Sequence, residues 1–261
     1  MTRTATIWAI RAAVAAGLLA LWQWGSYLPW LGKLALLDPF VVSKPSLIAA
    51  NLENLFGSKR FALHIGYTLG ATAIAIAVGI VTAMAVALLL FNLPKTRRLL
   101  EPFLHFFNTL PRVVLAPYLL IALGVGVMPR IVMAWSFVFF LVFYNVIYGL
   151  TRIKDAHRRH IRVLGGGRLD ELRSLQLPIA FAWTIRAFPQ AVAYGFVGTV
   201  FQEFIGGNSG IGSVMIYGLN ELNAATVMGT VIVLALLGWA LVAAGTRVEQ
   251  AFAPWRRELG V

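Results

Sequence analysis

The stretch of sequence that decides the fold lies between residues 61 and 91 and reads FALHIGYTLGATAIAIAVGIVTAMAVALLLF. It contains no Asp, Glu, Lys or Arg. A helix needs about 20 consecutive, mostly apolar residues to cross the hydrocarbon core of a bilayer. Because the stretch is longer than this, it predicts a membrane-spanning helix.

The composition of the whole chain agrees with that prediction. Hydrophobic residues make up 59% of the sequence, the mean hydropathy is +0.79, and charged residues make up only 12%, whereas a soluble globular domain has about 25% charged residues. The apolar runs are separated by short polar stretches, which predicts one continuous membrane domain over residues 1–261. The sequence has no cysteine, which excludes disulfides, thiolate metal sites and a cysteine nucleophile.

Six stretches are apolar enough to span a bilayer, and the predicted fold is therefore an all-α integral membrane protein. The predicted spans lie near residues 6–30, 61–91, 99–124, 128–150, 179–205 and 224–246. The first span resembles a signal peptide because Arg3 precedes an apolar run. Arg11 interrupts that run, however, and apolar residues continue through Trp24 and Tyr27. We therefore expect an uncleaved anchor.

The basic residues predict the orientation of the chain. Lys and Arg gather on the cytoplasmic side of membrane proteins, and an even number of spans places both termini on one side. On the N-terminal side the predicted spans leave Arg3, Lys95, Arg97, Arg98, Arg152, Lys154, Arg158, Arg159, Arg162, Arg168, Arg173, Arg247, Arg256 and Arg257. The other side holds Lys33, Lys44, Lys59, Arg60 and Arg130. We therefore expect cytoplasmic termini, and the net charge of +12 reflects topology rather than nucleic-acid binding.

Two segments outside the predicted spans are expected at the outer surface. Residues 45–56 place apolar side chains on one helical face after Pro45, which predicts a short amphipathic helix. Residues 206–223 are rich in glycine and contain no basic residue. We place this second segment at the external mouth of the helix bundle.

Catalytic motifs are absent from the sequence. No Gly-x-x-x-x-Gly-Lys-Ser/Thr loop is present to bind nucleotide phosphates. The four histidines, His64, His105, His157 and His160, do not form a His-Glu-x-x-His motif, and no Gly-x-Ser-x-Gly elbow occurs. Any ATP hydrolysis must therefore come from a partner protein, and we expect neither a catalytic site nor a metal site in this chain.

The most informative polar segment is the cytoplasmic loop, residues 151–178, TRIKDAHRRHIRVLGGGRLDELRSLQLP. It predicts a helix, a glycine break, a second helix and a proline that ends it. Val163 and Leu164 precede the break, and further leucines recur every third residue after it. An apolar stripe on a basic loop must be buried against another surface.

The spacing within this loop resembles the EAA loop of the permeases of binding-protein-dependent ABC importers, particularly the sulfonate, taurine and nitrate branch. That loop reads Glu-Ala-Ala, three residues, Gly, nine residues, Ile-x-Leu-Pro. Gly165, Leu175, Leu177 and Pro178 stand at the required offsets, and Arg159, His160 and Ile161 replace Glu-Ala-Ala. The resemblance covers roughly residues 40–258 and includes Asn108-Thr-Leu-Pro111, Ala116-Pro117, Gly124-Val-Gly126, Gln202-Glu203 and Ser209-Gly-Ile-Gly212.

The resemblance implies a six-span type I ABC importer permease fold with a cytoplasmic coupling helix, in a bacterial inner membrane. It implies two permease chains, most simply a homodimer, two ATPase subunits that hold ATP and Mg, and an external solute-binding protein. The residues expected to couple to the ATPase are His160, Arg162, Val163, Leu164, Gly165 and Leu169. A membrane-embedded enzyme and an ion-coupled carrier are the alternatives, but neither predicts the loop spacing.

Arg112 is the basic residue that needs a special explanation, because it lies inside the third predicted span. A cation exposed to lipid there costs about 2.5 to 3.5 kcal/mol on insertion scales. Arg112 therefore either lines an anion pathway or pairs with a carbonyl or a carboxylate such as Glu203. Asn108, Arg112, Gln202 and Glu203 are our pathway or gate candidates, and the solute is expected to be small and, if Arg112 faces it, anionic.

Overall fold

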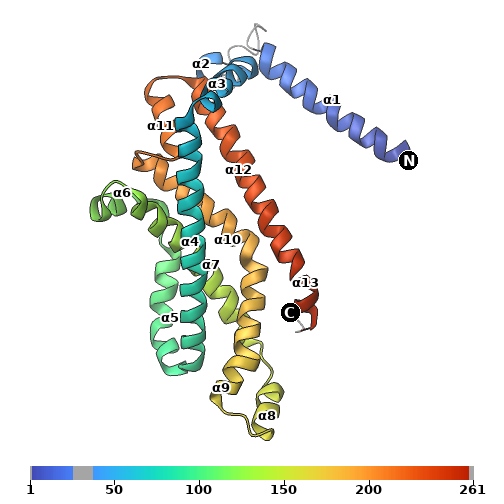
Figure 1. The fold of residues 1–261 in the computed structure, drawn as a ribbon, viewed down its shortest axis with the longest axis vertical. Helices are drawn as coiled ribbons and strands as arrows, with labels where there is room; N and C mark the ends of the chain where they lie inside the picture. Colours follow the sequence, from blue (N-terminus) through green and yellow to red (C-terminus); the bar gives the residue numbers. More distant parts are fainter. Residues whose placement is uncertain (1, 26–37, 259–261) are drawn as a thin grey trace. The chain divides into compact units, whose positions relative to one another are not determined.

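A computed structural model describes residues 2–25 and 38–258 of the chain. In these ranges every regular element is helical (Figure 1). Helices satisfy their own backbone hydrogen bonds, which is the requirement for an element that crosses lipid. The all-α prediction is confirmed for the described residues.

The chain divides into two compact units, which are described separately. Unit 1 comprises residues 1–65 and 209–235, and unit 2 comprises residues 66–208 and 236–261. Two long helices, α4 (Lys59–Asn92) and α12 (Ala224–Ala251), contribute residues to both units.

Unit 1 contains the N-terminal helix and three shorter helices, together with parts of α4 and α12. Its helices are α1 (Thr2–Trp24), α2 (Pro39–Val42), α3 (Pro45–Gly57) and α11 (Ile211–Asn220). Gln23 at the end of α1 donates a hydrogen bond to Ser46 Oγ at 3.0 Å and accepts one from the Ser46 backbone N–H at 3.1 Å. The helix predicted over residues 45–56 is confirmed as α3. The predicted end of the first span, at residue 30, lies outside the described residues.

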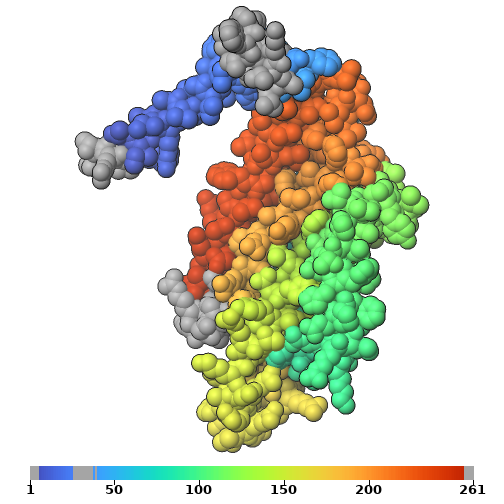
Figure 2. Space-filling model, turned by 180° about the vertical axis from the view of Figure 1, so that it is seen from behind, coloured from blue at the N-terminus to red at the C-terminus, as the bar shows by residue number. Residues whose placement is uncertain are grey.

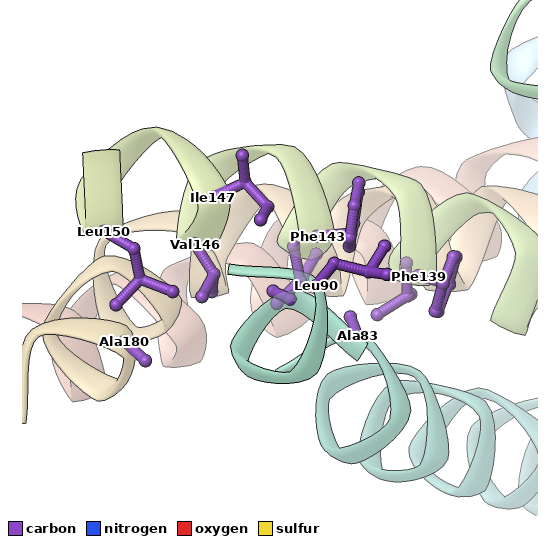
Figure 3. Packing of buried hydrophobic residues seen from close by; sticks show 12 residues of the cluster. Ala83, Leu90, Phe139, Phe143, Val146, Ile147, Leu150 and Ala180 are labelled. Atoms are coloured by element: carbon purple, nitrogen blue, oxygen red, sulfur yellow. The ribbon is translucent and has the colours of Figure 1, made fainter. Parts of the chain in front are cut away.

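Unit 2 contains the principal hydrophobic core. Its remaining helices are α5 (Pro94–Thr109), α6 (Arg112–Leu123), α7 (Val127–Thr151), α8 (Asp155–Val163), α9 (Arg168–Glu171), a π-helical turn (Leu172–Gln176), α10 (Leu177–Gly206) and α13 (Ala253–Glu258). Helix α7 packs along α10. Val138, Val142, Val146 and Leu150 follow one another at intervals of four residues, and all are fully buried. Figure 3 shows part of this stripe with Leu90 of α4 and Ala180 of α10.

A close approach of backbones holds α7 against α10. A Cβ atom built at Gly198 of α10 would lie 2.8 Å from the Ala134 Cα of α7, and one built at Gly149 of α7 would lie 2.1 Å from the Trp183 ring of α10. Small residues at helix crossings permit such packing in membranes. These two glycines therefore fix the register of the central helix pair.

Four of the six predicted spans agree with helices that are long and apolar enough to cross a membrane, namely Thr6–Trp24, Lys59–Asn92, Val127–Thr151 and Ala224–Ala251. The stretch predicted as the third span, residues 99–124, is not a single straight helix, because α5 and α6 meet at an angle of 91°. The bent pair is apolar enough to be one broken span, and its crossing of the membrane stays a prediction. Pro111 lacks a backbone N–H and disfavours helical angles at the preceding residue, and Leu110 has φ −58° and ψ 130°.

Helix α10 corresponds to the fifth predicted span, although it is less apolar than the other four. Its 30 residues correspond to about 45 Å, which is enough to cross a bilayer. Arg186, Gln190, Gln202 and Glu203 lower its average hydropathy. It is a partly polar helix that buries many of its residues within unit 2. That α10 crosses the membrane stays a prediction.

The proline predicted to end a cytoplasmic helix does not end one, and this prediction is wrong. Helical backbone continues from Arg168 to Gly206, and Pro178 lies in the first turn of α10. The N–H of Leu177 bonds to the carbonyl of Leu172, five residues back. A proline in a regular helix clashes with the carbonyl four residues earlier. The wider π turn, which ends directly before α10, lets the helix pass through this position.

Candidate coupling segment and solute pathway

The loop over residues 151–178, predicted to be cytoplasmic, folds into a short hairpin of helices within unit 2. Helix α8 ends at Val163, and Gly165 takes φ +81°, a conformation that costs little only for glycine. The Gly165 N–H donates to the Arg162 carbonyl at 3.0 Å, and the Gly166 N–H donates to the Ile161 carbonyl at 2.9 Å. The predicted glycine break is confirmed, and it caps α8 in the way common at helix C-termini.

The residues next to this break present apolar surface to the surroundings. Val163 is 85% exposed and Leu164 is 73% exposed. Leu169 is also exposed, as are the predicted coupling residues His160 and Arg162. Figure 2 shows the loop, in yellow, as one projecting end of unit 2. Neighbouring exposed apolar side chains beside a tight turn are typical of a surface that another protein covers.

A chain of polar side chains holds this loop against the long helices. Arg158 of α8 forms an ion pair with Glu171, with 3.2 Å between Nε and Oε1, and lies over the ring of Phe91 at 4.9 Å. Glu171 accepts a hydrogen bond from Gln176 at 3.2 Å, and Gln176 exchanges two amide hydrogen bonds with Asn92 at 2.7 and 3.1 Å. We call Arg158, Glu171, Gln176 and Asn92 the loop brace. Sequence reasoning missed it because its members have no characteristic spacing.

Arg112 and Asn108 lie together on a small cavity beside α7. Asn108 lies in the last turn of α5, and Arg112 begins α6. The break between these helices lets the Arg112 guanidinium donate to Asn108 Oδ1 at 2.9 Å. The same guanidinium lies over the rings of Phe137 and Phe140, at 4.8 and 5.2 Å. A cavity of about 390 Å³ is lined by these four residues and Leu141, Tyr144, Asn145 and Tyr194. We call it the Arg112 pocket.

The other two candidates, Gln202 and Glu203, lie in a separate buried cluster. Glu203 is fully buried; both of its carboxylate oxygens accept from Thr68 Oγ1 at 2.9 Å, and Oε1 lies 3.8 Å from Arg130 Nη1. Gln202 donates to the Ala116 carbonyl at 3.1 Å. The interaction considered between Arg112 and Glu203 is therefore not made, because Arg130 pairs with that carboxylate.

The burial of Arg130 weakens its use in the count of basic residues on the two sides of the membrane. The sequence counts Arg130 among the basic residues of the outer side, and in the structure its side chain is only 1% exposed in the first turn of α7. Its Nη2 donates to Asn208 Oδ1 at 3.4 Å. An arginine that is paired inside the fold says little about which side of the membrane a loop faces.

An apolar helical domain, a projecting apolar turn on a basic loop and a cation-lined cavity fit the membrane-spanning subunit of a transporter, and the match to a family model defines that class. The chain belongs to the family of binding-protein-dependent transport system inner membrane components, whose family model matches residues 75–258. The chain is thus a non-catalytic permease subunit of an ABC importer.

Individual relatives support this assignment. The formylaminopyrimidine transport permease protein ThiX of Halalkalibacterium halodurans is 24% identical over 85% of this chain and 88% of its own length. The taurine transport system permease protein TauC of Escherichia coli K12 is 20% identical over 88% of this chain and 85% of its own. An inward-facing structure of the MetNI methionine ABC transporter matches 74% of this chain and 95% of its own, with a TM-score of 0.64 and 19% identity.

Proposed function

We propose that this permease moves a small anionic solute past Arg112, and that the exposed tip of the cytoplasmic loop receives the motion of an ATPase subunit. The observation that carries the coupling role is the projection of Val163 and Leu164 beside the left-handed glycine turn at Gly165. Full burial of a leucine side chain is worth about 1.5 to 3 kcal/mol. A groove on the ATPase that covers this tip would give a firm joint.

The loop brace supports the same role. A lever transmits force only if its ends are stiffly connected, and a buried charged or amide network is costly to open once formed. Gln176 is only 2% exposed, and it connects α4 to the ion pair of Arg158 with Glu171. A push on α8 would therefore move the start of α10.

The solute class is inferred from the Arg112 pocket. Its walls combine one guanidinium, two amides and several aromatic rings, a combination that binds an oxyanion attached to an apolar body. Names of two relatives refer to taurine and to aliphatic sulfonates, which is in keeping with an anionic solute. An external binding protein would deliver it.

The assembly we propose contains two copies of this chain, two ATPase subunits that bind ATP and Mg, and one binding protein. The charge distribution supports cytoplasmic termini and a cytoplasmic loop over residues 151–178. Purification of an active transporter with a single permease chain would contradict the homodimer.

Uptake by the reconstituted complex tests the function. Arg112→Gln should reduce uptake of an anionic solute while the binding protein still captures it, because only the pathway has lost its charge. Arg98→Gln removes the charge of an exposed arginine outside the pocket, so it is the matched control and should transport normally. Normal uptake by a folded and assembled Arg112→Gln variant would remove Arg112 from the pathway, and uptake driven by an ion gradient without ATP would favour a carrier.

A further inference from the structure

A second hollow lies in unit 2, between α5, the C-terminal end of α7 and α10. It is a groove of about 630 Å³, and its wall includes Arg97, Arg152 and Arg186. Arg97 lies in α5, Arg152 directly follows α7, and Arg186 lies in α10. The fold therefore gathers three permanent positive charges on one concave surface.

These charges are not balanced by the groove's own acids. Glu101 is the acidic residue on its wall, and its carboxylate lies 4.0 Å from His105. In the described ranges, the carboxylate ion pairs involve none of the three groove arginines. Three positive charges against the single carboxylate of Glu101 leave an excess of positive charge, which favours the binding of an anion.

Aromatic rings hold two of the guanidinium groups in place. Arg152 lies over the Tyr148 ring at 4.4 Å, and Arg186 lies over the Trp183 ring at 4.9 Å. Stacking uses the face of a guanidinium and leaves the N–H groups on its edge to donate to oxygen atoms. One of these groups, on Arg152 Nη2, donates to the Tyr148 hydroxyl. The two rings also pack edge to face, with centroids 5.1 Å apart. Trp183 is buried and Tyr148 is 47% exposed, so the groove offers donors for an oxyanion beside the exposed Tyr148 ring.

The groove adjoins the Arg112 pocket along α7. Tyr144 and Asn145 line both hollows, so a ligand that leaves one meets the wall of the other. Arg97 and Arg152 flank the basic loops that are expected to be cytoplasmic. The groove therefore lies toward the release side if the proposed orientation holds.

We propose that this groove is a second binding site, for a small organic oxyanion, a carboxylate or sulfonate that carries a flat apolar body, and that it receives the solute from the Arg112 pocket. Its place in transport rests on the proposed function, but its binding chemistry rests on the groove alone. A lipid headgroup offers the same oxyanion chemistry. We assign the groove to a soluble anion because the exposed ring of Tyr148 stands beside the donors and offers apolar surface to the body of such a solute.

Equilibrium dialysis of the complete transporter in phosphatidylcholine nanodiscs tests this site. The probe is labelled benzenesulfonate, and benzyl alcohol is the uncharged probe of similar shape. We expect saturable binding of benzenesulfonate that Arg97→Gln and Arg186→Gln each weaken about tenfold, as expected for one lost charge-assisted hydrogen bond. Arg98→Gln is the matched control, because this neighbour is exposed and does not line the groove; it should leave binding unchanged.

The outcomes separate this inference from the proposed function. Benzenesulfonate binding that is unchanged in Arg112→Gln and about tenfold weaker in Arg97→Gln supports a distinct groove site, whatever the Arg112 variant does to uptake. Equal affinities of the Arg97, Arg98 and Arg186 variants, or equal binding of benzyl alcohol, would overturn it. If phosphatidylglycerol in the nanodisc fills the site and benzenesulfonate binds in neither lipid, the groove is a headgroup site and the assignment to solute is wrong.

Discussion

Leu164→Asp is the sharpest test of the coupling segment. Leu164 is 73% exposed, so about three quarters of the 1.5 to 3 kcal/mol available from burying a leucine, roughly 1 to 2 kcal/mol, is still to be gained when an ATPase covers it. A carboxylate at this tip loses that gain and must also be desolvated. Each 1.4 kcal/mol weakens docking about tenfold, and a homodimer has two such tips.

The assay compares ATPase activity of the assembled complex, with and without loaded binding protein, with solute uptake into vesicles. We expect Leu164→Asp to lose most of the stimulation by binding protein and most of the uptake. Two further variants separate the causes. Leu164→Met keeps an apolar tip and should behave as the natural chain, whereas Leu164→Asn loses the apolar contact without adding charge and should be intermediate.

The reasoning fails if Leu164→Asp, in a complex that contains its ATPase subunits, shows normal stimulation and normal uptake. Arg162 and Arg168 are close in sequence and offer counter-charges that would soften the defect. Leu164→Asn has no charge to be rescued. Normal activity of both polar variants would therefore leave the loop as a connection between helices.

The remaining predictions concern the turn, the buried cluster, the orientation and the brace. Gly165→Leu should reduce stimulated ATPase activity, because φ +81° costs a leucine about 1 to 2 kcal/mol; a normal rate would contradict this. Glu203→Gln should lower the melting temperature, since a broken buried pair costs roughly 3 to 5 kcal/mol, and the double variant with Arg130→Met should recover part of the loss. A cysteine at Ser174 should be labelled only from the cytoplasm, and labelling from outside would reverse the topology. Gln176→Leu should lower the uptake per ATP hydrolysed, which dual measurement of the two rates checks.

The bounds of a long apolar helix could be predicted well from the sequence where charged residues flank its ends. The prediction of 61–91 became α4 at Lys59–Asn92, and that of 128–150 became α7 at Val127–Thr151. Apolar length alone determines these elements, because lipid leaves the backbone no alternative to a helix. The average hydropathy could not reveal the 91° bend at Pro111, since a broken pair and a straight span have the same composition.

The candidate site was only partly predictable, because its contacts join distant segments. The exposure of Val163 and Leu164 follows from their position before a glycine turn. The pairing of Glu203 with Arg130, however, spans two helices, and the insertion cost that singled out Arg112 applies to any arginine within a span. The sequence predicts that an arginine within a span has a polar partner, but it does not identify the helix that carries this partner.

The unbroken helical backbone from Arg168 to Gly206 has a mechanical consequence. Its first turns belong to the hairpin of the proposed coupling segment, and its last turn carries Glu203, which contacts α4 through Thr68 and α7 through Arg130. A rotation applied at its first turns can therefore be transmitted to Glu203, except where the π turn and Pro189 interrupt the regular helix. The π turn at Leu172–Gln176 is then the place where part of this rotation can be absorbed. Its stiffness would set how quickly the contacts of Glu203 respond to a movement of the ATPase.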